Sequence, residues 1–515
     1  MTRAMVTSRV GSRSLESPSL GNLHNGFGEG REGHTCSAPG EPELTANATR
    51  LAPTLHNTNF LTPSDLKKKT NPQQRGLALG PTCNCTRRVF MFNPVLEFVN
   101  HASIIVDAGL GLRLLMDPWL DGAVFNNGWS LLSPSVIRED DFATITDIWI
   151  SHEHPDHFHP PSLRRIARQN GRQIRILFQY APHLSASKEI QDFCKSLGFR
   201  DFLELPPDQH LALNSNLSIR CQHHMWGDSW CHLILSDGGG KKTWTLFNAN
   251  DCEWYSEESA INVFAELGPI DVLLMQFSYA CWYADRDARM AEANRLIDRL
   301  VMLTKLSGAK YVIPFASFFW FCHDENQEMN RDINTVQRVA SAIATRTSAE
   351  PIILYPGDVW QIGKVINCQE ALSRYANDYD IVGKAVTHST KQFDLDDLQK
   401  KVATFWRGNY KSGHSAGADP DIVLFFRDLN CAGRWNADKL VPIQIRECDA
   451  DLVLASDSFA SVLETRWGAD TLRISARFSI PKGSRYRDFS DLTLKVAQSL
   501  NPNAPLDRPL RFPPK

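Results

Sequence analysis

The sequence has no uninterrupted hydrophobic run that could cross a membrane as a helix. Such a helix needs about 20 consecutive apolar residues, whereas the densest patch, PFASFFWF, spans only residues 314–321. The first residues, MTRAMVTSRVGSRSL, carry arginines and no acid, but they lack the apolar centre of a secretory signal. We therefore expect a soluble, cytoplasmic protein without a membrane partner, and an organellar transit peptide is the alternative interpretation of the N terminus.

An excess of charge and closely spaced cysteine pairs are also missing. A net charge of -3 over 515 residues gives no electrostatic reason to expect nucleic acid as a partner. Among the 12 cysteines only Cys83 and Cys85 lie close together, and no Cys-x-x-Cys pair occurs. Zinc ribbons and thioredoxin-like sites are therefore excluded, and we expect reduced thiols.

Core-forming residues are abundant outside the N-terminal region. The chain is 43% hydrophobic and 10% aromatic, and its length predicts two or three domains. Residues 1–88 are rich in Gly, Ser, Pro, Asn and Thr and show no hydrophobic period. This composition predicts a disordered or targeting tail, and Met91 is an alternative start of translation.

The residues after Val95 have the pattern of a layered α/β domain. Short β-branched and aromatic runs bounded by Gly, Asp, Asn and Pro predict strands, and apolar residues at three- and four-residue spacing predict the helices between them. The strands include SIIVDAG, LRLLMDP, DIWISH, IRILFQY, LSIRCQH and TWTLFNAND, and the helices include PSLRRIARQN and SKEIQDFCKSLG. We expect an αββα layered domain over residues 89–365.

The C-terminal part predicts a second, smaller unit. After a linker expected at residues 366–392, residues 393–515 alternate strands and helices and predict a small α+β domain. The expected strands are DIVLFFRDL, LVPIQIRE, ADLVLASD and TLRISARFSI, and the expected helices are SFASVLETRWG and FSDLTLKVAQSL.

Histidines and acids are concentrated in one stretch, ISHEHPDHFHPP, at residues 150–161. It follows an apolar strand and precedes a helix, and such loops are where side chains converge on a cleft. His152 and His154 can share one side of an extended chain, and Asp156 and His157 turn back at the helix entrance. One loop can therefore supply two nitrogens to one metal and an oxygen and a nitrogen to a second. The alternative is a solvated polar loop.

This His-x-His-x-Asp-His pattern is the signature of the metallo-β-lactamase superfamily, which the chain resembles from about residue 95 to 365. The resemblance implies an αββα metallo-β-lactamase sandwich. Upstream, NHASIIVDAGLGLRLLMDPWLDG is similar to the opening hairpin of one branch, with His101 and Asp117 at its matching positions. Asp117 would accept a hydrogen bond that orients a ligand imidazole, whereas His101 is either a structural histidine or part of the site.

The same resemblance implies ligands further along the chain. SIRCQHHMWGDSW offers His224, which position and order favour over His223 as the third ligand of the first metal, although the two are not separated. TWTLFNANDCEW offers Asp251 as the carboxylate that bridges both metals. Asp251 and Asp156 are therefore also the expected catalytic carboxylates.

The final ligand departs from the superfamily pattern. YVIPFASFFWFCHDE has no histidine just after its proline, and the nearest candidate is His323, nine residues beyond Pro314. We expect His323 to complete the second metal with Asp156 and His157.

Several motifs resemble the catalytic and C-terminal regions of the cytidine monophosphate N-acetylneuraminate hydroxylase family. They are NANDC, IPFASFFWFCHDE, ILYPGDVWQIGK and ADLVLASDSFASVLETRWGADTLRISARFSI. That family carries an N-terminal Rieske domain with Cys-x-His and Cys-x-x-His ligands, and no such pair of motifs precedes residue 95 here. The resemblance implies a di-iron oxygenase that hydroxylates a small-molecule substrate with dioxygen and electrons from a separate donor. Residues 393–515 resemble a sterol-carrier-like module.

A zinc hydrolase is the alternative. The same ligands filled with two zinc ions could cleave an ester, amide or phosphoester, and imidazole and carboxylate suit iron and zinc alike. An aromatic stretch could wall a substrate pocket or belong to the core, namely Phe277, Tyr279, Trp282 and Tyr283. Arg286 and Arg289 could bind an anionic substrate or lie on a solvated helix face, and a homo-oligomer is compatible with the sequence.

Overall fold

The computed structural model describes residues 94–137, 139–180, 185–224, 228–236, 242–254, 256–382, 384, 386–389, 391–410, 421–436, 438–464 and 468–485. All of them fall within one compact unit of the chain. The tail expected at residues 1–88, the alternative start at Met91 and the helix expected from FSDLTLKVAQSL lie outside the described residues.

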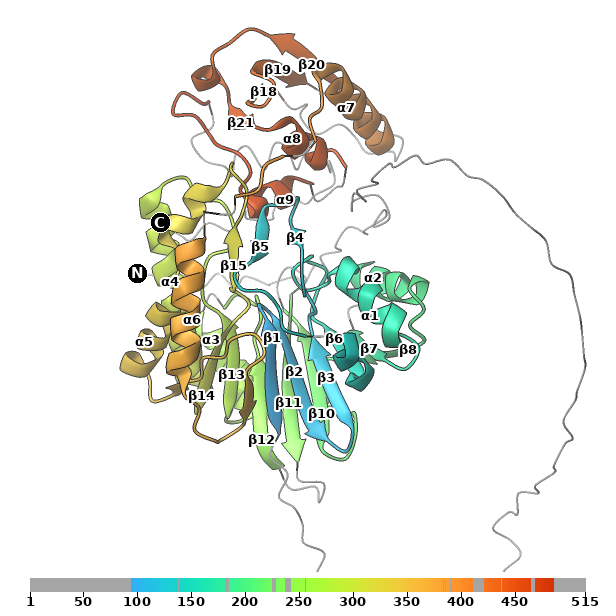
Figure 1. The fold of residues 1–515 in the computed structure, drawn as a ribbon, viewed down its shortest axis with the longest axis vertical. Helices are drawn as coiled ribbons and strands as arrows, with labels where there is room; N and C mark the ends of the chain where they lie inside the picture. Colours follow the sequence, from blue (N-terminus) through green and yellow to red (C-terminus); the bar gives the residue numbers. More distant parts are fainter. Residues whose placement is uncertain are drawn as a thin grey trace, which may run out of the picture. The chain divides into compact units, whose positions relative to one another are not determined.

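Two seven-stranded sheets form the centre of the fold (Figure 1). The first has the order β17 (Val359–Gln361), β1 (Val95–Asn100), β2 (Ser103–Gly109), β3 (Leu112–Met116), β6 (Asp147–Ile150), β7 (Arg175–Gln179) and β8 (Asp201–Leu205). The strands from β17 to β3 are antiparallel, and those from β3 to β8 are parallel.

The second sheet repeats this mixture of antiparallel and parallel pairs. Its order is β16 (Glu350–Pro351), β14 (Tyr311–Phe315), β13 (Val272–Gln276), β12 (Lys242–Asn248), β11 (Ser229–Ser236), β10 (Leu217–His223) and β9 (Leu211–Ala212). The pairs from β9 to β12 are antiparallel, and those from β12 to β16 are parallel.

Helices cover the outer faces of the sheets (Figure 1). Isoleucines of β2, β6 and β7 pack with α1 (Pro160–Asn170) and α2 (Ser185–Ser196). The second sheet packs with α3 (Glu257–Leu267), α4 (Arg286–Ser307), α5 (Val336–Arg346) and α6 (Cys368–Ile381). These four layers confirm the αββα metallo-β-lactamase sandwich predicted from the sequence.

Local signals fix the helix ends. Asp285 caps α4 by accepting a hydrogen bond from Ala288 N, and Gly308 ends that helix in the left-handed region with φ 64°. Both are the residue types that these positions favour. The helix α1 begins with two prolines after His159, whose side chain accepts from Ser162 N, and proline is favoured in the first turn.

Two small sheets lie outside the sandwich. One has the order β15 (Phe319–Phe321), β5 (Trp129–Leu131) and β4 (Ala123–Val124). The other, in the C-terminal region, has the order β20 (Lys439–Ile443), β19 (Cys431–Asn436), β18 (Ile422–Phe426) and β21 (Leu452–Leu454), with α7 (Leu395–Tyr410), α8 (Ser456–Val462) and α9 (Gly468–Ser475). The 3-10 helices are Glu139–Thr144, Gln327–Asp332 and Glu447–Asp449.

The C-terminal region differs from the sequence prediction at one element. TLRISARFSI was expected to form a strand, but α9 occupies its first half. Ala469 and Leu472, one helical turn apart, are both buried, so the apolar spacing that decides the structure is helical. Beyond the helix, Ser479 makes a β-bridge to Val453.

The segment expected to be a linker, residues 366–392, contains α6. Tyr375 of this helix is fully buried in the main core and donates its hydroxyl to Leu354 O at 2.8 Å.

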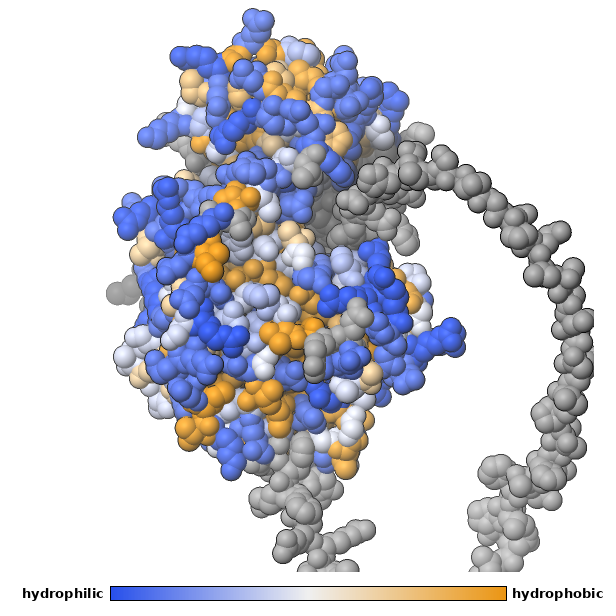
Figure 2. All heavy atoms as spheres, in the orientation of Figure 1, coloured by the Kyte–Doolittle hydropathy of each residue, from blue (hydrophilic) through white to orange (hydrophobic). Residues whose placement is uncertain are grey.

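No described helix is long and apolar enough to span a bilayer. Figure 2 shows mostly hydrophilic side chains over α6 and its neighbours on the visible face, as expected of helices that pack on a sheet with their other side.

Candidate metal centre

Loops rich in histidine and acid meet at one edge of the two large sheets. Asp117 follows β3, His152 lies just beyond β6, and Asp251 follows β12. The parallel neighbours β3 and β6 have their carboxyl ends at the same edge. Asn250 Nδ2 donates to Asp117 Oδ2 at 2.8 Å, which joins the end of β12 to the end of β3. The site is therefore built from strand ends of both sheets.

The first group of candidate ligands consists of His152, His154 and Asp251. Their ligand atoms all lie within 4.8 Å of one another. His152 Nε2 lies 3.0 Å from His154 Nδ1, and the other ring nitrogen of His152 lies 2.9 Å from Ser151 Oγ. The hydroxyl of Ser151 thus fixes the ring that presents Nε2 to the group.

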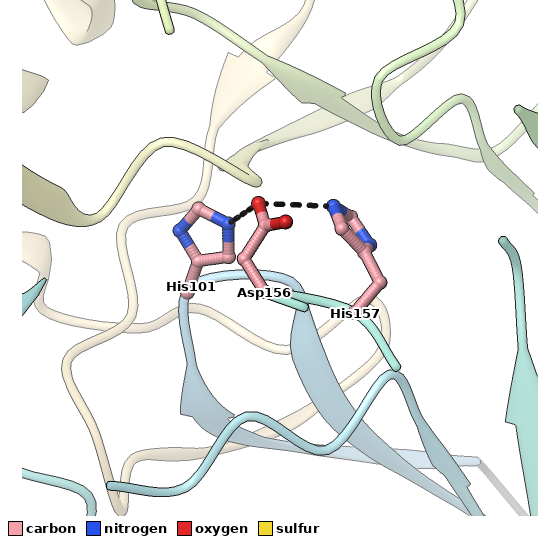
Figure 3. Close-up of side chains that lie close together, drawn as sticks. All are labelled: His101, Asp156 and His157. Carbon is pink, nitrogen blue, oxygen red and sulfur yellow. Dashed lines mark hydrogen bonds and ion pairs between the residues drawn. The ribbon is translucent and has the colours of Figure 1, made fainter. Parts of the chain in front are cut away.

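The second group consists of His101, Asp156 and His157, whose ligand atoms also lie within 4.8 Å of one another. Figure 3 shows the Asp156 carboxylate between the two imidazole rings. Its Oδ2 lies 3.2 Å from His101 Nε2 and 3.4 Å from His157 Nε2. All three residues are buried. The turn between β1 and β2 therefore supplies His101 to this group, and the loop after β6 supplies Asp156 and His157.

The two groups touch each other. His157 Nε2 lies 3.2 Å from Asp251 Oδ2, and the ring centroids of His152 and His157 are 4.2 Å apart. Asp251 therefore reaches residues of both groups, as a carboxylate that bridges two metals must. The arrangement fits a dinuclear metal site.

Asp117 accepts hydrogen bonds that position the residues of the site. Its fully buried carboxylate accepts from Ser151 N at 2.8 Å and Ser151 Oγ at 2.7 Å, and from His157 Nδ1 at 3.0 Å. A histidine that donates Nδ1–H to a carboxylate has its Nε2 lone pair directed to the opposite side. His157 Nε2 consequently faces Asp156 and Asp251, which is the geometry expected of an acceptor that orients a ligand.

Burial and neighbouring charges set the protonation of the centre. Burial lowers the pKa of His152 well below its usual value, and His157 and His154 lower it further. A neutral imidazole has a lone pair for a metal. Burial would raise the pKa of Asp156, but His157 and His101 hold it well below its usual value. This carboxylate is therefore anionic.

His157 has the opposite shift. Burial would lower its pKa, but Asp156 and Asp251, together with the hydrogen bond to Asp117, raise it well above the usual value. In the metal-free chain a positive imidazole ring therefore balances the carboxylates, and a bound cation would provide the same balance.

Buried polar atoms of the two groups have no hydrogen-bond partner among the residues that the structure describes. They are His101 Nδ1, Asp156 Oδ1 and Asp251 Oδ1. An unsatisfied buried carboxylate oxygen is costly, and a metal cation would satisfy it. Imidazole nitrogen and carboxylate oxygen suit iron, zinc and manganese, so these residues fit a metal centre.

The backbone at these strand ends is strained. His101, Asp117 and Asn250 have positive φ of 41°, 39° and 44°, a region that non-glycine residues rarely adopt. Hydrogen bonds hold two of them, from Ala316 N to His101 O at 2.9 Å and from Asn250 N to Asn248 Oδ1 at 3.0 Å. Strain of this kind concentrates at functional sites.

His223 is the last residue of β10, and His224 follows the strand. Side chains alternate along a strand, and Cys221 belongs to the main core, so His223 continues that face. His224 Nε2 instead lies 2.7 Å from Glu253 O, and the ring packs on Trp254 with centroids 4.5 Å apart. The structure does not bring His224 into either ligand group, although the sequence favoured it.

His323 is not brought to the centre either. It forms a separate group with Asp324 and Glu325. Its Nδ1 lies 2.7 Å from Asp324 Oδ1, and its Nε2 lies 3.3 Å from Ser389 Oγ. His323 follows β15 and its ring contacts Ser389, whereas His101 lies beside Asp156 and His157.

Sequence reasoning gave no role to Asp228, which lies near the first group. Its Oδ1 is 3.7 Å from His152 Nε2, and its side chain is only 8% exposed. Nothing in the local sequence distinguishes it from an aspartate at the start of any strand. His101 was singled out from the sequence by its place in the opening hairpin, but it was not expected among the metal ligands.

The aromatic stretch after β13 is mainly core. Phe277 and Tyr279 are buried, and Tyr279 donates to Met329 O. Arg286 is exposed, as expected of a solvated helix face. Arg289 is buried and forms an ion pair with Asp332 at 2.7 Å, so it contributes to structure and not to a solvated surface.

Comparisons with known proteins agree with this architecture. Residues 112–306 match the family described as Beta-lactamase superfamily domain. A putative Rieske 2Fe-2S iron-sulfur protein of Mycolicibacterium smegmatis is 28% identical over 252 residues, which cover 45% of this chain and 45% of that protein. The similarity therefore spans less than half of the relative's own length.

A shorter match concerns a hydroxylase. The cytidine monophosphate-N-acetylneuraminic acid hydroxylase of Danio rerio is 35% identical over 75 residues, or 14% of this chain and 12% of that protein. Among solved structures, CmlA, a diiron beta-hydroxylase from Streptomyces venezuelae, aligns with a TM-score of 0.38 and 17% identity over 52% of this chain and 54% of its own. Zn(2+)-bound PqqB from Methylobacterium extorquens aligns with a TM-score of 0.32 and 12% identity over 51% and 87%.

Proposed function

We propose, from the membership of residues 112–306 in the beta-lactamase superfamily, that this chain is an enzyme with two metal ions at the strand-end centre. The observation that carries the proposal is the contact between the two ligand groups through Asp251 and His157. A cluster with one group alone would support a single ion.

The proposed ligand sets follow the geometry. His152 and His154 hold the first metal, and His101, Asp156 and His157 hold the second, with Asp251 between them. Metals held by these residues would polarise oxygen ligands and, if redox-active, would pass electrons to an oxidant such as dioxygen.

The residues around the ligands position them. Asp117 fixes the ring of His157 through Nδ1, and Ser151 contacts both Asp117 and the ring of His152. Their burial excludes water from the side of the ligands that faces the sheets. The ligands can therefore stay in place when substrate enters.

We further propose that the metals are iron and that the chain hydroxylates a small-molecule substrate with dioxygen. Support comes from the local similarity to a hydroxylase and from the relative named as a Rieske protein. An iron–sulfur protein would be a suitable class of separate electron donor. The alternative is a dinuclear zinc hydrolase of an ester, amide or phosphoester, because the same ligand types accept zinc.

Metal analysis tests the dinuclear centre. The purified chain, reconstituted separately with iron, zinc and manganese, is expected to bind two ions per chain with at least one of them. Fewer than two bound ions with every metal would contradict the proposal.

Exposure to oxygen separates the two chemistries. The iron-loaded chain is reduced without oxygen, and its optical spectrum is followed as oxygen is admitted. We expect an iron-centred spectral change. An unchanged spectrum, together with cleavage of generic phosphodiesters or lactones by the zinc form, would favour the hydrolase.

A further inference from the structure

Asp228 lies at the strand ends that carry the metal centre. Asp228 directly precedes β11, whose register pairs Cys231 with Asn248 at the end of β12, the strand that leads to Asp251. On its other side, His224 N donates to Asp228 O at 2.7 Å. The backbone of Asp228 is therefore held at the turn between β10 and β11.

The Asp228 side chain is directed at the first ligand group. Its Oδ1 lies 3.7 Å from His152 Nε2, the nitrogen that also faces His154 at 3.0 Å. Two ligands bound to one ion at about 2.1 Å are separated by roughly 3–3.5 Å. A small inward shift of the carboxylate would therefore complete such a pair.

Burial also favours a cation at this place. The Asp228 side chain is 8% exposed and that of His152 is 1% exposed. A carboxylate in such surroundings is stabilised by a nearby positive charge. A metal bound by His152 would provide that charge at the observed position.

The neighbouring histidines compete for the same role. His224 is directed at Glu253 O and Trp254, away from the ligand groups. His223 lies on the inner face of β10, so it is the main competitor of Asp228 and belongs in the same experiment.

We infer that Asp228 is a carboxylate ligand of the first metal, together with His152, His154 and the shared Asp251. This inference rests on the proposed dinuclear function. A carboxylate in place of a third imidazole adds one negative charge to the first metal. It should therefore favour the more oxidised state of a bound iron.

The test compares Asp228→Asn with His223→Ala and His224→Ala. Metal content and affinity are measured by elemental analysis and by competition with a chelator, using zinc alone and ferrous iron alone. We expect Asp228→Asn to lose one of two ions, with first-site affinity at least about 100-fold lower, because it lacks an anionic ligand. The two histidine variants should keep both ions.

Asp121→Asn is the matched control. Asp121 is half exposed and pairs with Arg165, so the control removes the same charge without touching the centre. It should bind both ions as the original chain does. Retention of both ions at unchanged affinity by Asp228→Asn, or loss of one by His223→Ala alone, would overturn the inference.

Circular dichroism shows whether Asp228→Asn folds. If it does not fold, a second variant tests the inference. Asp228→His replaces the carboxylate by a neutral ligand and should keep two iron ions with a more positive Fe(III)/Fe(II) potential. An unchanged potential would contradict the assignment. If the original chain binds fewer than two ions, the proposed function fails. If the original chain and Asp228→Asn both bind two ions at the same affinity, only the role of Asp228 is refuted.

Discussion

Single residues at the strand ends decide which atoms face the metals. Asp117 accepts hydrogen bonds from Ser151, His157 and Asn250, so one carboxylate connects three loops of the centre. Its loss should affect metal binding even though we do not propose it as a ligand.

We predict that Asp117→Asn lowers the affinity of the second metal by about 10–100-fold, because an amide does not hold the His157 ring as a carboxylate does. Chelator competition measures this loss. Asp147→Asn is the control, since Asp147 is also buried but pairs with Arg175 at the start of β6. The control should change stability and leave metal affinity intact, and an equal loss in both variants would contradict the positioning role.

The choice between His101 and His323 gives a second prediction. His101→Ala should empty the second site, because its Nε2 faces Asp156 at 3.2 Å. His323→Ala should keep both ions, because its ring contacts Asp324 and Ser389. Metal titration into each variant decides, and loss of an ion only from His323→Ala would restore the assignment made from sequence.

His323 also predicts a pH dependence of stability. Burial lowers its pKa to about 4, and Arg477 adds to the effect. Because this folded value lies below the usual 6.5, the stability is full above pH 6.5 and falls as the pH decreases toward 4. Protonation of His323 should lower the free energy of unfolding by up to about 3 kcal/mol between pH 6.5 and 4.

Denaturant unfolding at a series of pH values measures the effect. His323→Gln should lose less stability than the original chain between pH 7 and 4. His388→Gln, which changes an exposed histidine beside Asp324, should follow the original chain. Parallel curves for all three chains would show that another group is responsible.

At the site, the sequence predicted what is local and missed what depends on tertiary contacts. His152, His154, Asp156 and His157 are within one loop, so their spacing alone predicted their convergence. The structure places His323 in a separate group with Asp324 and Glu325, because the path of the chain after β15 depends on strand pairing and not on local spacing. Asp228 was missed because it reaches the site only through strand pairing.

At the scale of elements, the strands of the large sheets could be predicted from local sequence, whereas a C-terminal helix could not. Strands such as β2 and β6 are buried on both faces and have nearly continuous apolar sequences, so they were predictable. The strand expected over residues 471–480 was wrong: Leu472, Ile474 and Phe478 fit the alternation of a strand, but the first two of them lie in the helix α9. Contacts with the rest of the chain decided between them.

Glu325 connects the loop after β15 to two C-terminal elements. Its Oε1 accepts from Ala455 N at the start of α8, and its Oε2 accepts from Ser458 Oγ and Arg477 Nε at 3.0 and 2.9 Å. Arg477 is fully buried and also pairs with Asp457 at 2.9 Å. This network holds the C-terminal region against the loop.

We predict that Glu325→Ala lowers the free energy of unfolding by about 3–5 kcal/mol, because it leaves the buried Arg477 with one carboxylate fewer. Denaturant unfolding measures the loss. Glu464→Ala removes an exposed pair with Lys401 and should cost at most about 1 kcal/mol. A similar small loss in both variants would show that Asp457 alone is enough for Arg477.

At the scale of the whole molecule, the sequence predicts that residues 1–88 are dispensable. Their composition cannot bury enough apolar surface to offset the entropy of ordering. A chain that begins at Met91 should therefore keep the metal content and the cooperative melting of the full chain. Loss of either property on removal would assign the segment to the fold.

The end of α9 and the residue that follows it are part of the wall around the metal centre. Ile474 O accepts from Trp129 Nε1 at 3.0 Å, and Ser475 O accepts from Asn326 Nδ2 at 2.7 Å. Gly128 leaves no room for a side chain here, because a Cβ would lie 2.6 Å from Ser475 Cβ. Ala476 is fully buried in the aromatic cluster with Trp119 and Phe319, whose rings contact His101.

This arrangement has a consequence for biosynthesis. A ribosome makes the chain from the N terminus at about 5–20 residues per second, so the sheets and their histidines emerge before the segment around Ala476 exists. Until that segment arrives, the aromatic side chains around His101 lack one of their packing partners. We therefore expect a nascent chain that ends before residue 473 to bind chaperones that recognise exposed apolar surface, and its release should coincide with translation of the last few residues that close the wall.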